Sequence, residues 1–157
     1  MILSIIMRDL IEYGGISDIV PHTSNCYKIL NLQGTMSLPD SFPSIESICK
    51  FNTIPSIINI EIKDTPCSTS SIGQTLTGKK LNFQGVLNNT LEYSSPKSSY
   101  NINIFEFYHE FCDYIILPED YIESSFLGLV PYVHYCNIIK ISEHKFFYNV
   151  CLGFSGD

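Results

Sequence analysis

Cysteine and histidine are the residues of this sequence best suited to nucleophilic or metal chemistry, with 6 cysteines and 4 histidines in 157 residues. A thiol nucleophile needs a base within hydrogen-bonding reach. His109 lies just before Cys112, and His134 lies just before Cys136. In a strand, side chains at positions i and i+2 lie side by side, which does not aim a base at a nucleophile. We therefore expect no catalytic residue and no enzymatic activity.

Metal-binding spacing is also missing. Structural zinc sites use two pairs of ligands, such as C-x₂₋₄-C with a second matching pair, and the chain has no CxxC, HxxxH or HExxH motif. The alternative is three ligands assembled in space from His134, Cys136 and either Cys112 or Cys151. No segment has the spacing of a phosphate-binding loop. We expect no metal and no cofactor.

The charge balance limits the classes of partner. Lys and Arg number 9 against 16 Asp and Glu, which gives a formal net charge of −7. Such a chain has no electrostatic footprint for phosphate backbones or anionic lipid, so we expect neither nucleic acid nor a membrane as a partner. The apolar opening Met1–Met7 lacks the basic region of a signal peptide and is followed by Arg8 and Asp9. We expect the protein to stay in the cytoplasm where it is made.

Composition and hydrophobic periodicity indicate a β protein. Alanine, the best helix former, is absent, and Ile, Tyr and Phe recur throughout. From Leu81 to Tyr93 apolar residues alternate with polar ones, and after a Pro/Ser loop the alternation resumes from Asn101 to Phe111. We expect these two segments to form an antiparallel hairpin. Further strands are expected at 26–34, 54–63, 132–141 and 146–154.

The predicted fold is all-β, an antiparallel β-sandwich or partly closed barrel of about 7–9 strands. Residues 1–15 form an N-terminal arm and residues 16–157 a single β domain. Within the arm, Ile2 to Tyr13 has the apolar spacing of a short helix. A further turn of helix is expected around Pro118–Tyr121. The Ser/Thr-rich stretch from Pro66 to Lys80 is interpreted as a long connection.

One disulfide follows from the expected register of the last two strands. If Glu143 and His144 form a two-residue turn, Cys136 lies directly opposite Cys151 on the same face. Opposed residues in an antiparallel pair have Cα atoms about 4.5–5.5 Å apart, which a disulfide tolerates. A slip of one residue would remove the match.

The segment from about Leu38 to Phe154 resembles the SPOCS domain, a family of endospore-forming Firmicutes associated with spore coat assembly. The resemblance lies in the rhythm of strands and aromatic residues. The segments that carry it are Pro43-Ser-Ile-Glu-Ser-Ile48, Gly78-Lys-Lys-Leu-Asn-Phe-Gln-Gly-Val-Leu87, Leu91-Glu-Tyr93, Phe105-Glu-Phe107, Phe111, Ile115-Ile-Leu-Pro118, Val130-Pro-Tyr-Val133 and Phe146 to Leu152.

This resemblance implies a β-rich domain with a structural or docking role and supplies no catalytic motif. Family members often carry a C-terminal LysM module, and we expect this protein to stand alone without one. We expect a structural, self-assembling component of the endospore surface, either coat or appendage filament. The alternatives are an adaptor that docks a spore morphogenetic protein and a carbohydrate-binding β domain that uses tyrosine-rich faces. For the last, Tyr93, Tyr108 and Tyr114 are among the tyrosines expected to be exposed.

The N-terminal arm is the expected assembly element. Exposed apolar residues on a monomer would be costly, at about 25 cal/mol per Å², so we expect the arm to dock on a neighbouring copy in a homo-oligomer or homopolymer, with other coat proteins as further partners. The alternative is that the arm folds back on its own core. The residues concerned are Ile2, Leu3, Ile5, Ile6, Met7, Leu10 and Ile11.

The expected location follows from the same resemblance. The protein would be made in the mother-cell cytoplasm during sporulation and remain on the spore surface, in the coat, exosporium or an appendage. Thiols that are reduced in the cytoplasm can oxidise after lysis of the mother cell. Cys26 and Cys67, near predicted loops, are the expected intermolecular disulfide partners.

Overall fold

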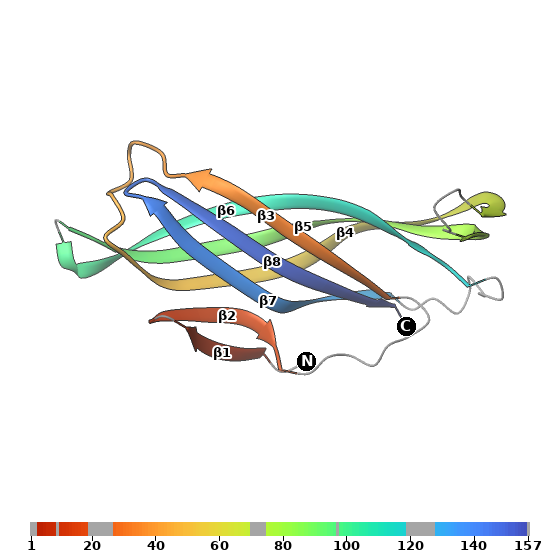
Figure 1. Cartoon of the computed structure of the whole chain (residues 1–157), viewed down its shortest axis with the longest axis horizontal. Helices are drawn as coiled ribbons and strands as arrows, with labels where there is room; N and C mark the ends of the chain where they lie inside the picture. The colour runs from red at the N-terminus through yellow and green to blue at the C-terminus, as the bar shows by residue number, and fades with distance from the viewer. Residues whose placement is uncertain are drawn as a thin grey trace.

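The computed structural model describes residues 3–8, 10–18, 27–69, 75–96, 98–118 and 128–156, and these residues form an all-β fold (Figure 1). This confirms the predicted fold class, and no helix occurs in the described part of the chain. The strands are β1 (Leu3–Arg8), β2 (Ile11–Ser17), β3 (Tyr27–Ser37), β4 (Ser47–Thr69), β5 (Thr75–Ser95), β6 (Ser98–Ile116), β7 (Leu129–Ser142) and β8 (Lys145–Gly156).

Two antiparallel three-stranded layers make up most of the molecule. One layer has the order β4-β5-β6 and the other has the order β3-β8-β7. The long strands β4, β5 and β6 run along the molecule, and the second layer crosses them obliquely (Figure 1). The strand order continues through β2, which makes one nearly closed, barrel-like sheet. The fold is thus intermediate between a sandwich and a barrel.

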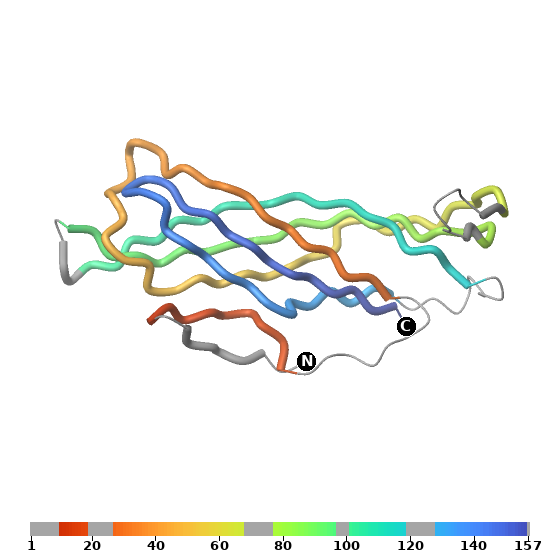
Figure 2. Tube along the Cα trace, in the orientation of Figure 1, coloured from red at the N-terminus to blue at the C-terminus, as the bar shows by residue number. Residues whose placement is uncertain are grey.

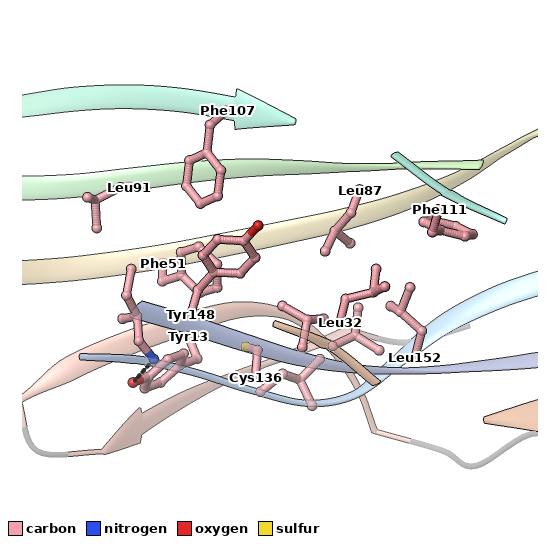
Figure 3. Packing of buried hydrophobic residues seen from close by; sticks show 14 of the residues in the cluster. Tyr13, Leu32, Phe51, Leu87, Leu91, Phe107, Phe111, Cys136, Tyr148 and Leu152 are labelled. Atoms are coloured by element: carbon pink, nitrogen blue, oxygen red, sulfur yellow. Dashed lines mark hydrogen bonds between the residues drawn. The ribbon is translucent and has the colours of Figure 1, made fainter. Parts of the chain in front are cut away.

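The core lies between the inward faces of the two layers, where apolar residues occupy alternate strand positions. From β5, every odd-numbered residue from Leu81 to Tyr93 is buried. Aromatic rings cross between the layers, with ring centroids 4.6 Å apart for Phe83 and Phe154 and 5.0 Å apart for Phe107 and Tyr148. Figure 3 shows side chains from both layers pointing toward one another.

Strand β2 connects the two layers on one side of the core. It pairs in parallel with β4, where Tyr13 is the partner of Phe51, and in parallel with β7, where Ile16 is the partner of Val133. Figure 2 shows this segment running beside the start of β4 and along β7. Tyr13 is 1% exposed and Ile16 is 4% exposed, so the segment supplies part of the core. β1 pairs antiparallel with β2.

Two glycines allow β2 to approach β4 closely. A Cβ on Gly14 would collide with the side chain of Asn52, and a Cβ on Gly15 would collide with the backbone carbonyl of Thr53. Gly15 also has a φ of +95°, in the region that favours glycine. The pair of glycines therefore permits a junction that side chains would block.

On the opposite side of the core, β3 and β6 approach one another without joining into a ladder (Figure 1). Lys28 of β3 forms an ion pair with Asp113 of β6, with 3.5 Å between Nζ and Oδ1. At the other end of this side, the Phe42 ring packs edge-on against Phe105, with centroids 5.1 Å apart. Side chains, rather than backbone hydrogen bonds, close the sandwich here.

Several predicted elements are confirmed and others are corrected. The predicted β5–β6 hairpin and the two-residue turn at 143–144 are present. The predicted helix at Ile2–Tyr13 is wrong, because the described residues there form the hairpin β1–β2, whose Tyr13 is anchored in a sheet. The predicted turn of helix at 118–121 lies mostly outside the described residues. The interpretation of 66–80 as a connection is corrected, since its described residues, 66–69 and 75–80, are strand, with Cys67 paired with Thr77 and Thr69 with Thr75.

The junction predicts a difference between two glycines that both have positive φ. Gly15→Ala should lower the free energy of unfolding by about 2–5 kcal/mol, because backbone strain adds to a collision with Thr53. Gly128→Ala is the matched control, since its φ is +152° and nothing lies within 4 Å of a Cβ placed there. That control should cost about 1–2 kcal/mol. Urea denaturation measures both, and equal losses would contradict the close approach of β2 to β4.

Candidate functional site

The predicted assembly arm folds back on its own chain in this structure. Ile2 lies outside the described residues, as do the side chains of Leu3, Ile5, Ile6 and Met7, although the backbone of β1 pairs with β2. Of the remaining arm residues, Leu10 is 90% exposed and Ile11 packs against the core. The arm is therefore only partly built into the fold, because β2 contributes to the core whereas β1 pairs with β2 outside the core.

Tyr13 attaches the arm to β7 with its hydroxyl. The hydroxyl donates to Asn137 Oδ1 at 3.0 Å and accepts from the backbone N–H of Ile138 at 3.2 Å. A buried hydroxyl with both roles satisfied stabilises its site, whereas an unsatisfied one would cost about 1–3 kcal/mol. This anchor has no sequence signal beyond a tyrosine beside two glycines.

The predicted disulfide between Cys136 and Cys151 is wrong. The register of β7 and β8 shifts between Lys140 and Ser142, so Cys136 is the partner of Val150 and Cys151 the partner of Tyr135. Successive side chains along a strand point to opposite faces, and Cys136 is fully buried in the core while Cys151 is half-buried on the outer face. The turn was predicted correctly, but the bulge next to it moved the pairing by one residue.

The other cysteines differ in exposure. Cys67 and Cys112 are exposed, and Cys49 is half-buried. None of these three forms a disulfide in the monomer. Cys67 remains an accessible candidate for an intermolecular bridge, and Cys26 lies outside the described residues.

A hydrogen-bonded group of aromatic residues ties β3 to β7 across β8. The Tyr132 hydroxyl donates to the Tyr27 hydroxyl at 2.9 Å, and the Tyr27 hydroxyl lies 3.1 Å from His134 Nε2. Tyr132 lies over Gly153, where a Cβ would collide with its ring. Burial, and then the hydrogen bond with Tyr27, raise the pKa of Tyr132, and burial also raises the pKa of the nearby Cys151 thiol.

The raised pKa values of Tyr132 and Cys151 mean that both residues keep their protons at neutral pH. A raised thiol pKa lowers the thiolate fraction at neutral pH, which makes Cys151 a poor nucleophile. The same holds inside the core, where His109 Nδ1 lies 2.7 Å from the Tyr148 hydroxyl and burial raises the pKa of Tyr148. The arrangement of these groups fits a structural role.

A shallow groove of about 460 Å³ crosses the outer face of β4, β5 and β6. Its polar lining includes the amides of Asn59, Asn82 and Gln84 and the carboxylate of Glu61. Tyr114 forms its aromatic part, with Lys28 Nζ and Lys80 Nζ at 5.2 and 5.3 Å from the ring centroid. Amides and one aromatic ring are groups that can bind polyhydroxy ligands. Of the other tyrosines expected on a sugar-binding face, Tyr108 is exposed, while Tyr93 is buried in the core.

Charge is divided unequally between the two outer faces. Strand alternation places charged side chains of both signs on the outside of the β4-β5-β6 layer, namely Glu61, Glu92, Glu106 and Glu110 together with Lys50, Lys63 and Lys80. On the outside of the β3-β8-β7 layer, the described residues include one charged side chain, Lys145, at the hairpin end. The same layer exposes five large apolar side chains, Ile29, Val130, Tyr135, Ile139 and Ile141.

Comparison with known proteins adds no family. Searches against protein-family models, curated proteins and solved structures find no match. The described residues contain no cluster of three or more His, Cys, Asp or Glu arranged to hold a metal ion. They also contain no helix of the length and hydropathy needed to cross a membrane. The resemblance to the SPOCS family stays a prediction from the sequence.

The corrected register predicts the reactivity of each thiol. In the native, reduced protein a maleimide should label Cys67 and Cys112 quickly, because both are exposed. Cys136 should react at least about 100-fold more slowly than these two exposed thiols, because labelling needs local opening of the core. Because the pKa of Cys151 is raised, its labelling should begin at higher pH than that of Cys67. Mass spectrometry of digested samples measures each site.

Labelling in guanidinium chloride is the control, and all of these cysteines should then react at similar rates. A disulfide-linked peptide that joins Cys136 to Cys151 in air-oxidised native protein would contradict the register. Fast native labelling of Cys136 would contradict it equally.

Proposed function

We propose that this protein is a structural subunit that assembles with copies of itself, and that the hairpin β1–β2 is the exchanged element. The observation that carries the proposal is the position of β2, an N-terminal strand that completes the core by parallel pairing with β4 and β7. In a polymer, the same strand would pair with β4 and β7 of the next copy.

Exchange of the hairpin conserves the interactions of the monomer. The hydroxyl contacts of Tyr13, the buried Ile16 and the pairing with β4 are the same whether the hairpin comes from the same chain or from a neighbour. The balance between the two forms then depends on protein concentration and on the connection between Ser17 and Tyr27, which has nine residues and can span up to about 30 Å. A head-to-tail exchange that does not close into a ring produces an open chain.

The setting of this assembly is proposed from the resemblance to the SPOCS family. The protein would be synthesised in the mother cell of a sporulating bacterium and would be retained on the spore surface, in coat, exosporium or appendage. Exposed Cys67 would stabilise the assembly by oxidation after release from the cytoplasm. Detection on purified spores, but not in vegetative cells, tests the setting separately from the assembly.

The groove on the outside of β4-β5-β6 supports a second candidate function, that of a carbohydrate-binding domain. Its amides, its carboxylate and the Tyr114 ring are suited to hydroxyl-rich ligands. Sugar binding that is lost in Tyr114→Ala, in a protein that stays monomeric, would favour this function over assembly. An adaptor role would instead require a separate partner protein on the same surface.

An engineered disulfide between β2 and β4 tests the exchange. Glu12 and Lys50 are Cα partners in these two strands, so Glu12→Cys with Lys50→Cys can form a bridge. Cys26, Cys49, Cys67 and Cys112 are replaced by serine in the same protein. If the hairpin is exchanged, oxidation of assembled protein should produce a ladder of covalent oligomers on a non-reducing denaturing gel.

The matched control places the cysteines in one β-hairpin of one chain. Asn59 and Gln84 are Cα partners in β4 and β5, so Asn59→Cys with Gln84→Cys should form monomers with an internal bridge under the same conditions. Assemblies seen by electron microscopy in which every engineered β2–β4 bridge lies within one chain would refute hairpin exchange. A protein that remains monomeric at every concentration would refute self-assembly itself.

A further inference from the structure

The outer face of the β3-β8-β7 layer differs from a typical solvated sheet surface. Its exposed side chains alternate along three paired strands, so their rows follow from the register. One row runs Thr35, Phe147, Ile139 and the next runs Gln33, Asn149, Asn137. These rows bring apolar and amide side chains together and contain no charge. We call this surface, made by the outward residues of β3, β7 and β8, the uncharged face.

The uncharged face leaves substantial apolar surface in water. Ile139 is 52% exposed, Ile141 54%, Ile29 53%, Tyr135 43% and Val130 41%. Single exposed apolar residues are ordinary, but a set on one face with no interspersed acid marks an interaction surface. Charged residues are depleted in the same way at the centres of protein interfaces.

We propose that the uncharged face packs against the uncharged face of a second copy of this chain, as a contact separate from hairpin exchange. The charge distribution favours a second copy over an unrelated partner. Each copy carries −7, but the outward rows of β3, β8 and β7 hold no acidic side chain among the described residues, so face-to-face packing brings no carboxylates together. This contact rests on the proposed assembly function but uses different residues.

The amide row provides polar complementarity between identical surfaces. An amide group both donates and accepts hydrogen bonds, so exposed Gln33 can pair with an amide of a second copy, and the amide N–H of Asn137 can donate to one while its Oδ1 accepts from Tyr13. A two-fold axis through this row makes the contact self-complementary.

The size of the face predicts a weak contact. β3, β8 and β7 contain 11, 12 and 14 residues, which at usual strand spacing and rise cover about 500 Å² on each copy. The pair would bury about 1,000 Å² in total, near the lower limit for a specific interface. Isolated subunits should therefore dimerise reversibly, and the contact would gain strength inside a polymer, where many copies act together.

The test uses full-length protein in which hairpin exchange is blocked. The monomeric fraction of the oxidised Glu12→Cys, Lys50→Cys protein has its hairpin tied to its own β4. Sedimentation velocity from low micromolar to near-millimolar concentration should show a reversible monomer–dimer equilibrium. Ile139→Glu, which places a charge on the uncharged face, should weaken dimerisation at least tenfold.

Ile104→Glu is the matched control, because Ile104 is 54% exposed and lies on the outer face of β6. It adds the same charge on the other layer and should leave the dimer unchanged. Ile29→Glu, on β3, is a second variant of the uncharged face and should act like Ile139→Glu. Unfolding midpoints confirm that each variant is folded, which is expected because all three positions are exposed.

The outcomes separate this contact from hairpin exchange. A bridged protein that stays monomeric, or a dimer that neither Ile139→Glu nor Ile29→Glu weakens, would overturn the proposal. Equal weakening by Ile104→Glu would overturn it as well, since it would indicate an effect of net charge. If the bridged protein dimerises but the unmodified protein does not polymerise, this contact is supported. In that case only hairpin exchange is rejected.

Discussion

Parallel pairing of β2 with β4 and β7 is the interaction on which the rest of this structure depends. Without it, the fold would be two three-stranded layers held by their packed core, by loops and by side chains at the β3–β6 side, with no strand pairing between them among the described residues. Tyr13 and Ile16 fill the core where the layers meet, and Gly14 and Gly15 allow the backbone to come close enough. One short strand therefore makes two layers into one nearly closed sheet.

The same strand is the basis of the proposed function. An element that completes a core by strand addition can be supplied by the same chain or by another, and its contacts are unchanged. The uncharged face is independent of this exchange, because it lies on the outward side of β3, β8 and β7. In the proposed assembly, hairpin exchange would extend a polymer and the uncharged face would join polymers side by side.

The sequence was most informative where a strand has one buried face and no irregularity. Leu81 to Tyr93 pairs with β6 without a bulge, and its predicted alternation matches the buried face except at Tyr93, which was also expected to be exposed and is buried. In β4, a bulge between Ile57 and Asn59 leaves Ile58 64% exposed, although its spacing from Ile60 and Ile62 would place all three on one face of a regular strand. Periodicity alone does not reveal a bulge, and each bulge changes the face of every residue beyond it.

Pairing between strands that are distant in the sequence was the second feature that the sequence alone did not predict. The arm has apolar residues at helical spacing, but its conformation is decided by β4 and β7, which are distant in sequence. For Cys136 and Cys151 the turn was right and the register was wrong by one residue. The uncharged face was not anticipated, because it appears only when β3, β8 and β7 are aligned.

Native-state hydrogen exchange of a Tyr13→Ala variant tests the central role of β2 most directly. Loss of a large buried aromatic side chain should lower stability by about 3–5 kcal/mol. If β2 holds the layers together, the slowest-exchanging amides of β5 in one layer and β8 in the other should lose protection by the same amount. Loss of protection confined to β1 and β2, with β5 and β8 unchanged, would contradict the account.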